Sequence, residues 1–211
     1  MINEIQGSDA WINSRLGKVT ASRIAHIVAK TKSGYSTSRA NYALELALER
    51  ITNTPYEWFK KNAYMEWGTE TEPAARCAYE AHTGMLVGEV GMIPHPTLAM
   101  TGASPDGLVG LDGQIEIKCP GSTKHLANLV SKQADEDYMC QMQWQMACTN
   151  RSWCDFVSYD PRFPEHLQLV VVRVPRNETF IADLEKEVKA FLAEIEAAVK
   201  KLNDLQPKEI K

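Results

Sequence analysis

The stretch SPDGLVGLDGQIEIKCP, Ser104–Pro120, places charged side chains in what otherwise reads as two short apolar strands joined by a turn. Successive side chains of a strand point to opposite faces, so Glu116 and Lys118 share one face, roughly 6.6 Å apart. Ile115 and Ile117 take the other face, where we expect them to pack into the core. The strand therefore has to present two opposite charges side by side.

The turn before this strand determines which other group comes near. Asp112-Gly113, within LDGQ, favours a tight two-residue hairpin connection. Such a hairpin folds the preceding strand back and brings Asp106 close to Glu116. Two carboxylates so placed form a hard-oxygen site suited to Mg²⁺ or Mn²⁺. That site suits phosphodiester hydrolysis, in which the cation binds the scissile phosphate and activates water; Lys118 would orient and deprotonate that water.

A plainer interpretation stays open from these residues alone. Asp106 can simply follow Pro105 in a turn, and the charged pair on the strand can be a solvated face. Glu72, in WGTETEP, adds another carboxylate near the start of a predicted helix. An acid at that position also complements the helix dipole. A metal site and a solvated surface therefore remain as competing hypotheses.

Hydrophobic spacing predicts the elements around this stretch. We expect helices over 20–29, 36–51, 70–84, 135–149 and 177–205. The apolar face of the 36–51 helix is expected to be Leu44, Leu48 and Ile51. Pro73 suits the first turn of the 70–84 helix and Gly84 its end. Strands are expected within 85–120 and at 152–160 and 167–174. The order predicts a single α/β domain over 1–211, with a central mixed sheet flanked by helices.

Composition limits the class of protein. The 211 residues include 23 Lys+Arg and 27 Asp+Glu, a net charge of −4, so any positive surface for nucleic acid has to be local. Five scattered cysteines fit free thiols in a reducing compartment. No apolar run of about 18 residues predicts a membrane span, and the start does not resemble a secretory signal. We therefore expect a cytoplasmic protein without a membrane partner.

Several ordered motifs carry a resemblance that runs from Trp11 to Arg162. They are RLGKVTASRI, WGTETEPAAR, TGASPDGLVG, IEIKCP and YMCQMQWQM. In this order and at this spacing they resemble the phage lambda exonuclease family, the YqaJ-like viral recombinases. The resemblance implies a restriction-endonuclease-like PD-(D/E)xK core. It also implies Mg²⁺-dependent 5′→3′ digestion of one strand of linear duplex DNA, with Mn²⁺ as a substitute for Mg²⁺.

The family pattern assigns roles to individual positions. Asp106 and Glu116 match its metal ligands, with the backbone carbonyl of Ile117 as a further ligand. Lys118 matches its catalytic lysine. Glu72 matches its helix carboxylate near the metals. Three of the four charged residues of the opening stretch, Asp106, Glu116 and Lys118, thus match the family's catalytic positions.

The family also implies a DNA-binding set. The positions that handle the 5′-phosphate and the scissile strand are Arg15, Ser22, Ser104 and Gln141. Tyr138, one turn before Gln141, would line the same site, and Met65 matches an apolar wedge that separates the strands. Each has a plainer alternative: Arg15 can be a solvated arginine, Gln141 the polar face of a helix, and Met65 a core residue.

The resemblance further implies partners and an assembly. The expected partners are 5′-phosphorylated duplex ends and a single-strand annealing protein, and the expected assembly is a homotrimeric ring around DNA. The resulting 3′ overhangs would serve phage-type recombination. Two other functions stay open: an endonuclease of the same fold, and a non-catalytic module that binds DNA ends.

Overall fold

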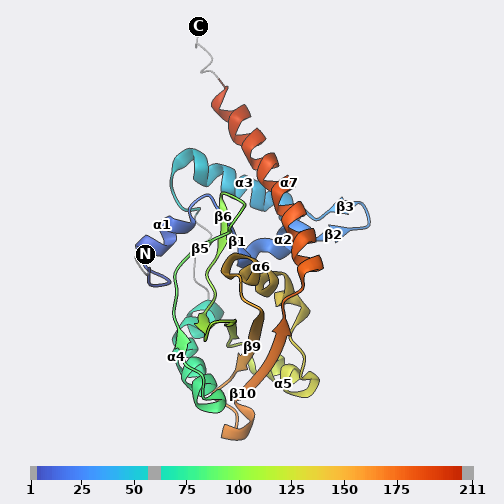
Figure 1. The fold of residues 1–211 in the computed structure, drawn as a ribbon. Helices are drawn as coiled ribbons and strands as arrows, with labels where there is room; N and C mark the ends of the chain where they lie inside the picture. The colour runs from blue at the N-terminus through green and yellow to red at the C-terminus, as the bar shows by residue number, and fades with distance from the viewer. Residues whose placement is uncertain (1–3, 57–62, 206–211) are drawn as a thin grey trace.

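A mixed five-stranded sheet carries the stretch Ser104–Pro120 in the computed structural model, which describes residues 4–56 and 63–205 (Figure 1). Across the sheet the strands are β10 (Leu169–Pro175), β9 (Trp153–Tyr159), β8 (Gly113–Lys118), β7 (Gly107–Val109) and β4 (Val87–Gly88). β8 and β9 are parallel, and the other neighbours are antiparallel. The predicted mixed sheet is therefore confirmed.

Helices cover both faces of this sheet. α4 (Ala63–Thr83) packs Tyr79 against Ile115 and Ile117 of β8. On the opposite face, α6 (Met139–Thr149) packs Met142 against Phe156 of β9. α5 (Ser122–Ser131) lies beside β9 as well. Because Glu116 alternates with the two isoleucines, its side chain points to the α6 face.

A second layer surrounds a smaller, three-stranded sheet of β1 (Val19–Thr20), β6 (Thr101–Ala103) and β5 (Ile93–Pro94). Figure 1 shows α7 running past α2 and α3 in this layer. Their shared core is centred on Tyr42, Trp144 and Phe191. The remaining elements are α1 (Asp9–Arg15), η1 (Ala21–Arg23), α2 (Ile24–Val28), β2 (Lys30–Thr31), β3 (Gly34–Tyr35), α3 (Thr37–Thr52), η3 (Glu136–Tyr138), η4 (Glu165–Leu167) and α7 (Glu178–Asn203).

The apolar face expected for the 36–51 helix is wrong. Leu44, Leu48 and Ile51 are 67%, 44% and 42% exposed. α3 instead buries its neighbouring face, on which Arg39 reaches α7 and donates to Glu194 at 2.7 Å. The same face buries Tyr42, Leu46 and Ala47 in the core, so a second set of apolar residues at helical spacing, together with the buried ion pair, faces inwards.

Other boundaries differ from the sequence-based expectation. The 20–29 helix is shorter, because Thr20 belongs to β1 and the chain continues as a 3₁₀ turn into α2. Pro73 lies inside α4, which begins at Ala63, whereas Gly84 ends that helix as expected, with φ +70°. α1, α5 and the β2–β3 hairpin were not expected. In 4–56 and 63–205, no helix combines the length and apolar character that crossing a bilayer requires.

Gly113 is part of a strand and not of the turn that Asp112-Gly113 was expected to make. Val109 pairs with Gly113, so the connection consists of residues 110–112, with Gly110 at φ +54°. Gly113 also pairs in parallel with Trp153. A Cβ on Gly113 would lie 2.0 Å from the Trp153 ring. The glycine is needed here because the indole fills the space that a side chain would take.

A buried carboxylate on β9 ties α4 to the edge of the sheet. Asp155 Oδ2 accepts from the Tyr79 hydroxyl of α4 at 2.8 Å. Arg173 of β10 donates to both oxygens, from Nε and Nη2, each at 2.9 Å. Its guanidinium lies 3.6 Å from the centre of the Trp153 ring. Asp155 is 2% exposed, so these donors replace the hydrogen bonds that water would give to an exposed carboxylate.

We predict that Asp155→Ala lowers the free energy of unfolding by about 3 kcal/mol, because it leaves a buried hydroxyl and a guanidinium without their acceptor. Urea unfolding at pH 7 measures this. Asp183→Ala, at an exposed position of α7, is the matched control, with an expected change within about 0.5 kcal/mol. Equal effects of the two substitutions would show that the buried network contributes nothing.

Candidate active site

A cavity of about 520 Å³ opens where β8 ends, between α4 and α6. It collects every predicted site residue whose side chain the structure describes. Those lining residues are Arg15, Ser22, Glu72, Ser104, Asp106, Glu116, Ile117, Lys118, Tyr138 and Gln141. The side chain of Met65 lies outside the described residues. Positions scattered over most of the sequence thus meet at one place.

Glu116 is the most enclosed acid of the cavity, at 1% exposure. Lys118 Nζ lies 2.5 Å from Oε1, confirming that the two side chains share a face of β8. Gln141 donates to the same oxygen at 2.7 Å, and Gln145 donates to Oε2 at 2.6 Å. A carboxylate so buried is not a solvated strand face, so that alternative is wrong.

Asp106 lies beside Glu116, as the predicted hairpin requires. Its Oδ2 accepts from the backbone N–H of Ile117 at 2.6 Å, which joins the loop before β7 to β8. Burial, followed by the negative charges of Glu116 and Glu72, raises the pKa of Asp106 well above its ordinary value. Both burial and the neighbouring carboxylates therefore oppose ionisation of Asp106.

Glu72 approaches the same cavity from α4. Burial raises its pKa, while Arg76, one turn along the helix, opposes the rise. Arg76 Nη2 donates to Glu72 Oε1 at 2.6 Å, and its Nη1 lies 3.0 Å from Glu89. Glu72 would have to exchange this partner to bind a cation.

Lys118 carries a proton in this arrangement. Burial lowers its pKa, but the charges of Glu116 and Asp106 outweigh burial and hold the pKa above its ordinary value. The ammonium also lies 4.6 Å from the centre of the Tyr138 ring. It can hold and orient an oxygen, but it can accept a proton only after the neighbouring negative charge is neutralised by something else.

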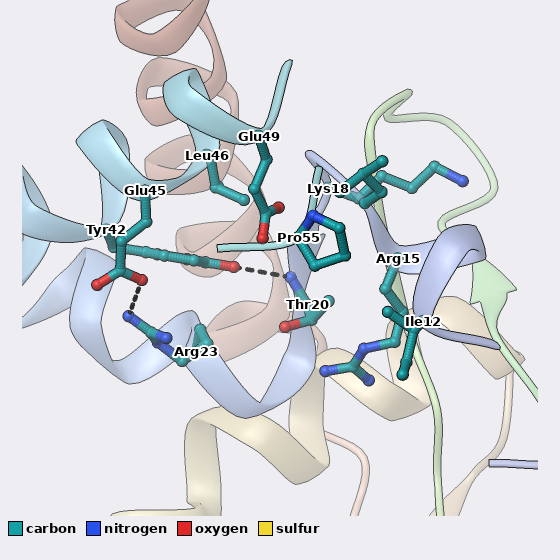
Figure 2. Close-up of a pocket in the computed structure, with 11 residues that line it drawn as sticks. Ile12, Arg15, Lys18, Thr20, Arg23, Tyr42, Glu45, Leu46, Glu49 and Pro55 are labelled. Carbon is teal, nitrogen blue, oxygen red and sulfur yellow. Dashed lines mark hydrogen bonds and ion pairs between the residues drawn. The ribbon is translucent and has the colours of Figure 1, made fainter. Parts of the chain in front are cut away.

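Arg15 enters the cavity from α1, and no residue within 4–56 and 63–205 forms an ion pair with it. Its guanidinium lies 4.1 Å from the centre of the Trp11 ring. Burial lowers its pKa to about 10, so it stays charged at neutral pH. Figure 2 shows it beside a second, small cavity, where Arg23 pairs with Glu45 and Tyr42 accepts from the Thr20 N–H, while no dashed line reaches Arg15. A charged, partly buried group without a partner is suited to an anion.

Two functional contacts were missed in the sequence. Gln145 follows Gln141 by one helical turn, and this spacing was the available signal. Trp11 donates from its indole N–H to Ser104 Oγ at 2.9 Å and also faces Arg15. No spacing rule links Trp11 to Ser104, because that contact crosses two elements far apart in the chain.

The donor set fits a hard divalent cation. Asp106, Glu116 and the Ile117 carbonyl supply oxygen, the ligand type that Mg²⁺ and Mn²⁺ prefer. Burial is the main cause that raises the pKa of both Asp106 and Glu72, and the negative charge of Glu116 adds to each rise. A cation bound between these carboxylates would offset that repulsion. In the described part of the chain, no three His, Cys, Asp or Glu side chains cluster closely enough to hold a metal by themselves. Backbone oxygen and water would have to complete the coordination.

Comparisons with known proteins agree with this geometry. Residues 10–152 match the YqaJ-like viral recombinase domain. The crystal structure of LHK-Exo, an alkaline exonuclease from Laribacter hongkongensis, is 49% identical, with a TM-score of 0.86 over 93% of this chain and 96% of that one. The structure of LHK-Exo in complex with dAMP is also 49% identical, with a TM-score of 0.86 over 92% of this chain and 96% of that one.

A more distant match shares the fold. A phage-related exonuclease from Haemophilus somnus 129PT is 18% identical, with a TM-score of 0.72 over 88% of this chain and 96% of that one. A search of curated proteins finds no significant match. The solved exonucleases confirm the predicted fold class, a mixed sheet flanked by helices with a PD-(D/E)xK core.

We predict that Asp106→Asn stabilises the metal-free protein at pH 8. The folded pKa of Asp106 is raised, so ionisation opposes folding: the penalty is absent below the unfolded pKa, about 3.9, and complete above the folded pKa. Asparagine keeps an acceptor for the Ile117 N–H without the charge. Thermal unfolding in EDTA should therefore show a gain at pH 8 that disappears near pH 4.

The matched control is Asp112→Asn, in the exposed β7–β8 connection. It should change the melting temperature little at either pH. A gain for Asp106→Asn that is the same at pH 4 and pH 8 would contradict an origin in charge repulsion.

Proposed function

The chain belongs to the YqaJ-like viral recombinase family, and we propose that it is a Mg²⁺-dependent 5′→3′ exonuclease that digests one strand of linear duplex DNA. Similarity to an alkaline exonuclease supports exonuclease activity. The observation that carries the proposal is one cavity that holds Asp106, Glu116 and Lys118 together with the unpaired guanidinium of Arg15. The 3′ overhangs left behind would serve phage-type recombination.

The carboxylates of β8 and its neighbouring loop would hold the cation. Asp106 and Glu116 are the side-chain ligands, the Ile117 carbonyl is the backbone ligand, and Glu72 lies nearby. A bound divalent cation supplies Lewis-acid polarisation of the scissile phosphate and lowers the pKa of an attacking water. Gln141 and Gln145 keep the Glu116 carboxylate in one orientation.

Lys118 would hold the attacking water and offset charge on the phosphate. In the described state its ammonium binds Glu116 Oε1. With the carboxylates neutralised by a bound cation, the negative charge that raises the Lys118 pKa would be reduced. The ammonium could then release one proton to solvent, and the resulting neutral amine could accept a proton from the attacking water. Tyr138, whose ring lies beneath the ammonium, limits the directions that the amine can take.

Arg15 and Ser22 would bind the 5′-phosphate, with Ser104 and Gln141 along the strand. A guanidinium-phosphate contact is charge-assisted and stronger than one between neutral groups. Holding the end at Arg15 while the carboxylates act on a phosphodiester further along the strand gives digestion its direction. LHK-Exo has been solved in complex with dAMP, which supports the binding of a nucleotide by this chain as well.

We predict that Lys118→Ala abolishes digestion of 5′-phosphorylated linear duplex in Mg²⁺ but keeps duplex-end binding, because the lysine acts on water and not on the metal. Gel analysis of products and fluorescence anisotropy measure the two properties. Lys189→Ala, on the exposed side of α7, is the matched control and should digest normally. Wild-type enzyme should be inactive in EDTA and should spare closed circular duplex.

Specific outcomes would overturn the proposal. Cutting of closed circles by the wild type indicates an endonuclease. Binding of ends without digestion under any divalent cation indicates a non-catalytic end-binding module. Near-normal digestion by Lys118→Ala refutes the role assigned to the lysine.

We also propose a homotrimeric ring around DNA that works with a single-strand annealing protein. A closed ring keeps a small enzyme on its substrate through many turnovers, and heterologous contacts can close in this way. Light scattering should return about three times the 23.6 kDa chain mass. A monomer that digests long duplexes without dissociating would exclude the ring and leave the active site unaffected.

A further inference from the structure

One indole touches two of the proposed phosphate-binding residues. Trp11 and Arg15 are one turn apart on α1, and the guanidinium lies 4.1 Å from the centre of the indole ring. The indole N–H donates to Ser104 Oγ, at 2.9 Å, across the cavity wall. Trp11 itself lines the cavity. The same side chain therefore joins the helix that supplies Arg15 to the loop that supplies Asp106.

The stack limits how Arg15 can move. An arginine side chain has many rotamers, and within the described residues no hydrogen bond or ion pair fixes this guanidinium. The ring face attracts the cation without using its N–H donors. All donors of Arg15 thus stay available for an anion, while the plane of the guanidinium is set in advance.

The hydrogen bond sets the polarity of Ser104. An indole N–H only donates, so the hydroxyl oxygen is the acceptor and its own hydrogen must point elsewhere. That hydrogen is directed at Met92 Sδ, 3.7 Å away. A thioether is a weak acceptor, and a phosphate oxygen would replace it readily. Trp11 thereby occupies the acceptor side of Ser104 and leaves its hydrogen, now on a weak acceptor, free to be given to a phosphate in the cavity.

We propose that Trp11 is the positioning residue through which this cavity recognises a 5′-phosphate, because it orients the Arg15 guanidinium with its ring and the Ser104 hydroxyl with its N–H. The inference rests on the proposed function, since it assigns a further determinant to the same site. Trp11 acts only through these two neighbours and not on the reacting atoms.

Two substitutions separate the ring from its N–H. Trp11→Phe keeps a stacking surface and removes the donor, whereas Trp11→Ala removes both. Initial rates on linear duplexes with 5′-phosphate and 5′-hydroxyl ends give a preference ratio for each variant. We expect this ratio to fall about tenfold in Trp11→Ala and about threefold in Trp11→Phe. A purely structural defect would lower both rates alike and leave the ratio unchanged, which would overturn the inference.

The control is Trp153→Ala, which removes another tryptophan stacked on an arginine, at the far end of β9. Its ratio should equal that of the wild type, and melting temperatures should establish that each variant is folded. Arg15→Ala should also lower the ratio, and adding Trp11→Ala to it should change the ratio by less than Trp11→Ala does alone. If Trp11→Ala lowered the preference ratio by the same factor with and without Arg15, Trp11 would not act through Arg15.

Binding measurements keep this inference distinct from the proposed function. In the Lys118→Ala background, anisotropy with both duplexes should show the same loss of phosphate preference when Trp11 is replaced. Failure of the wild type to digest duplex overturns the proposed function, but the binding ratio still decides the role of Trp11. A wild type that digests and binds both ends equally overturns the inference and leaves the exonuclease intact.

Discussion

The carboxylate of Glu116 is almost wholly buried, and much of the cavity is arranged to keep it there. Lys118, Gln141 and Gln145 all bind it, so β8 and α6 have to meet at one register. A buried charge without such donors would be strongly destabilising. The parallel pairing of β8 with β9 and the packing of α6 on the sheet are therefore constrained by one side chain as well as by the core.

Two further carboxyl groups, those of Asp106 and Glu72, lie near the hydrogen-bonded carboxylate of Glu116. Burial and the charge of Glu116 raise the pKa of both Asp106 and Glu72. Arg15 lines the same cavity, and within residues 4–56 and 63–205 it has no ion pair. A fold selected only for stability would bring such groups together. Here no ion pair joins Arg15 to these carboxylates within the described residues, so a cation can bind the carboxylates and an anion can bind Arg15. Charged groups left without an ion pair lower the stability of the fold, and in exchange they remain able to bind a ligand.

The sequence predicted the catalytic strand, the sheet and the meeting of the site residues, because alternation along β8 and ordered motifs are local signals. The sequence-based prediction missed elements whose buried side chains are polar. α5 turns His125 and Asn128 inwards to Ser158, so hydrophobic periodicity could not reveal it. In α3 two apolar faces competed in the sequence, and the helix buries the one with Tyr42 and Leu46, beside Arg39, leaving Leu44 exposed. The contact of Trp11 with Ser104 depends on how two distant elements pack, which no pattern within either one encodes.

The close approach of Gly113 to the Trp153 ring has a consequence for protein engineering. Replacing glycine by alanine is a common route to higher stability, because it restricts the unfolded chain. At this position the added methyl group would meet the indole and push the first residue of β8 away from β9. A slip by one residue would turn Glu116 and Lys118 to the opposite face of the sheet. Libraries designed to improve this protein should therefore leave position 113 unchanged, although it lies five residues from the lysine that it keeps in place.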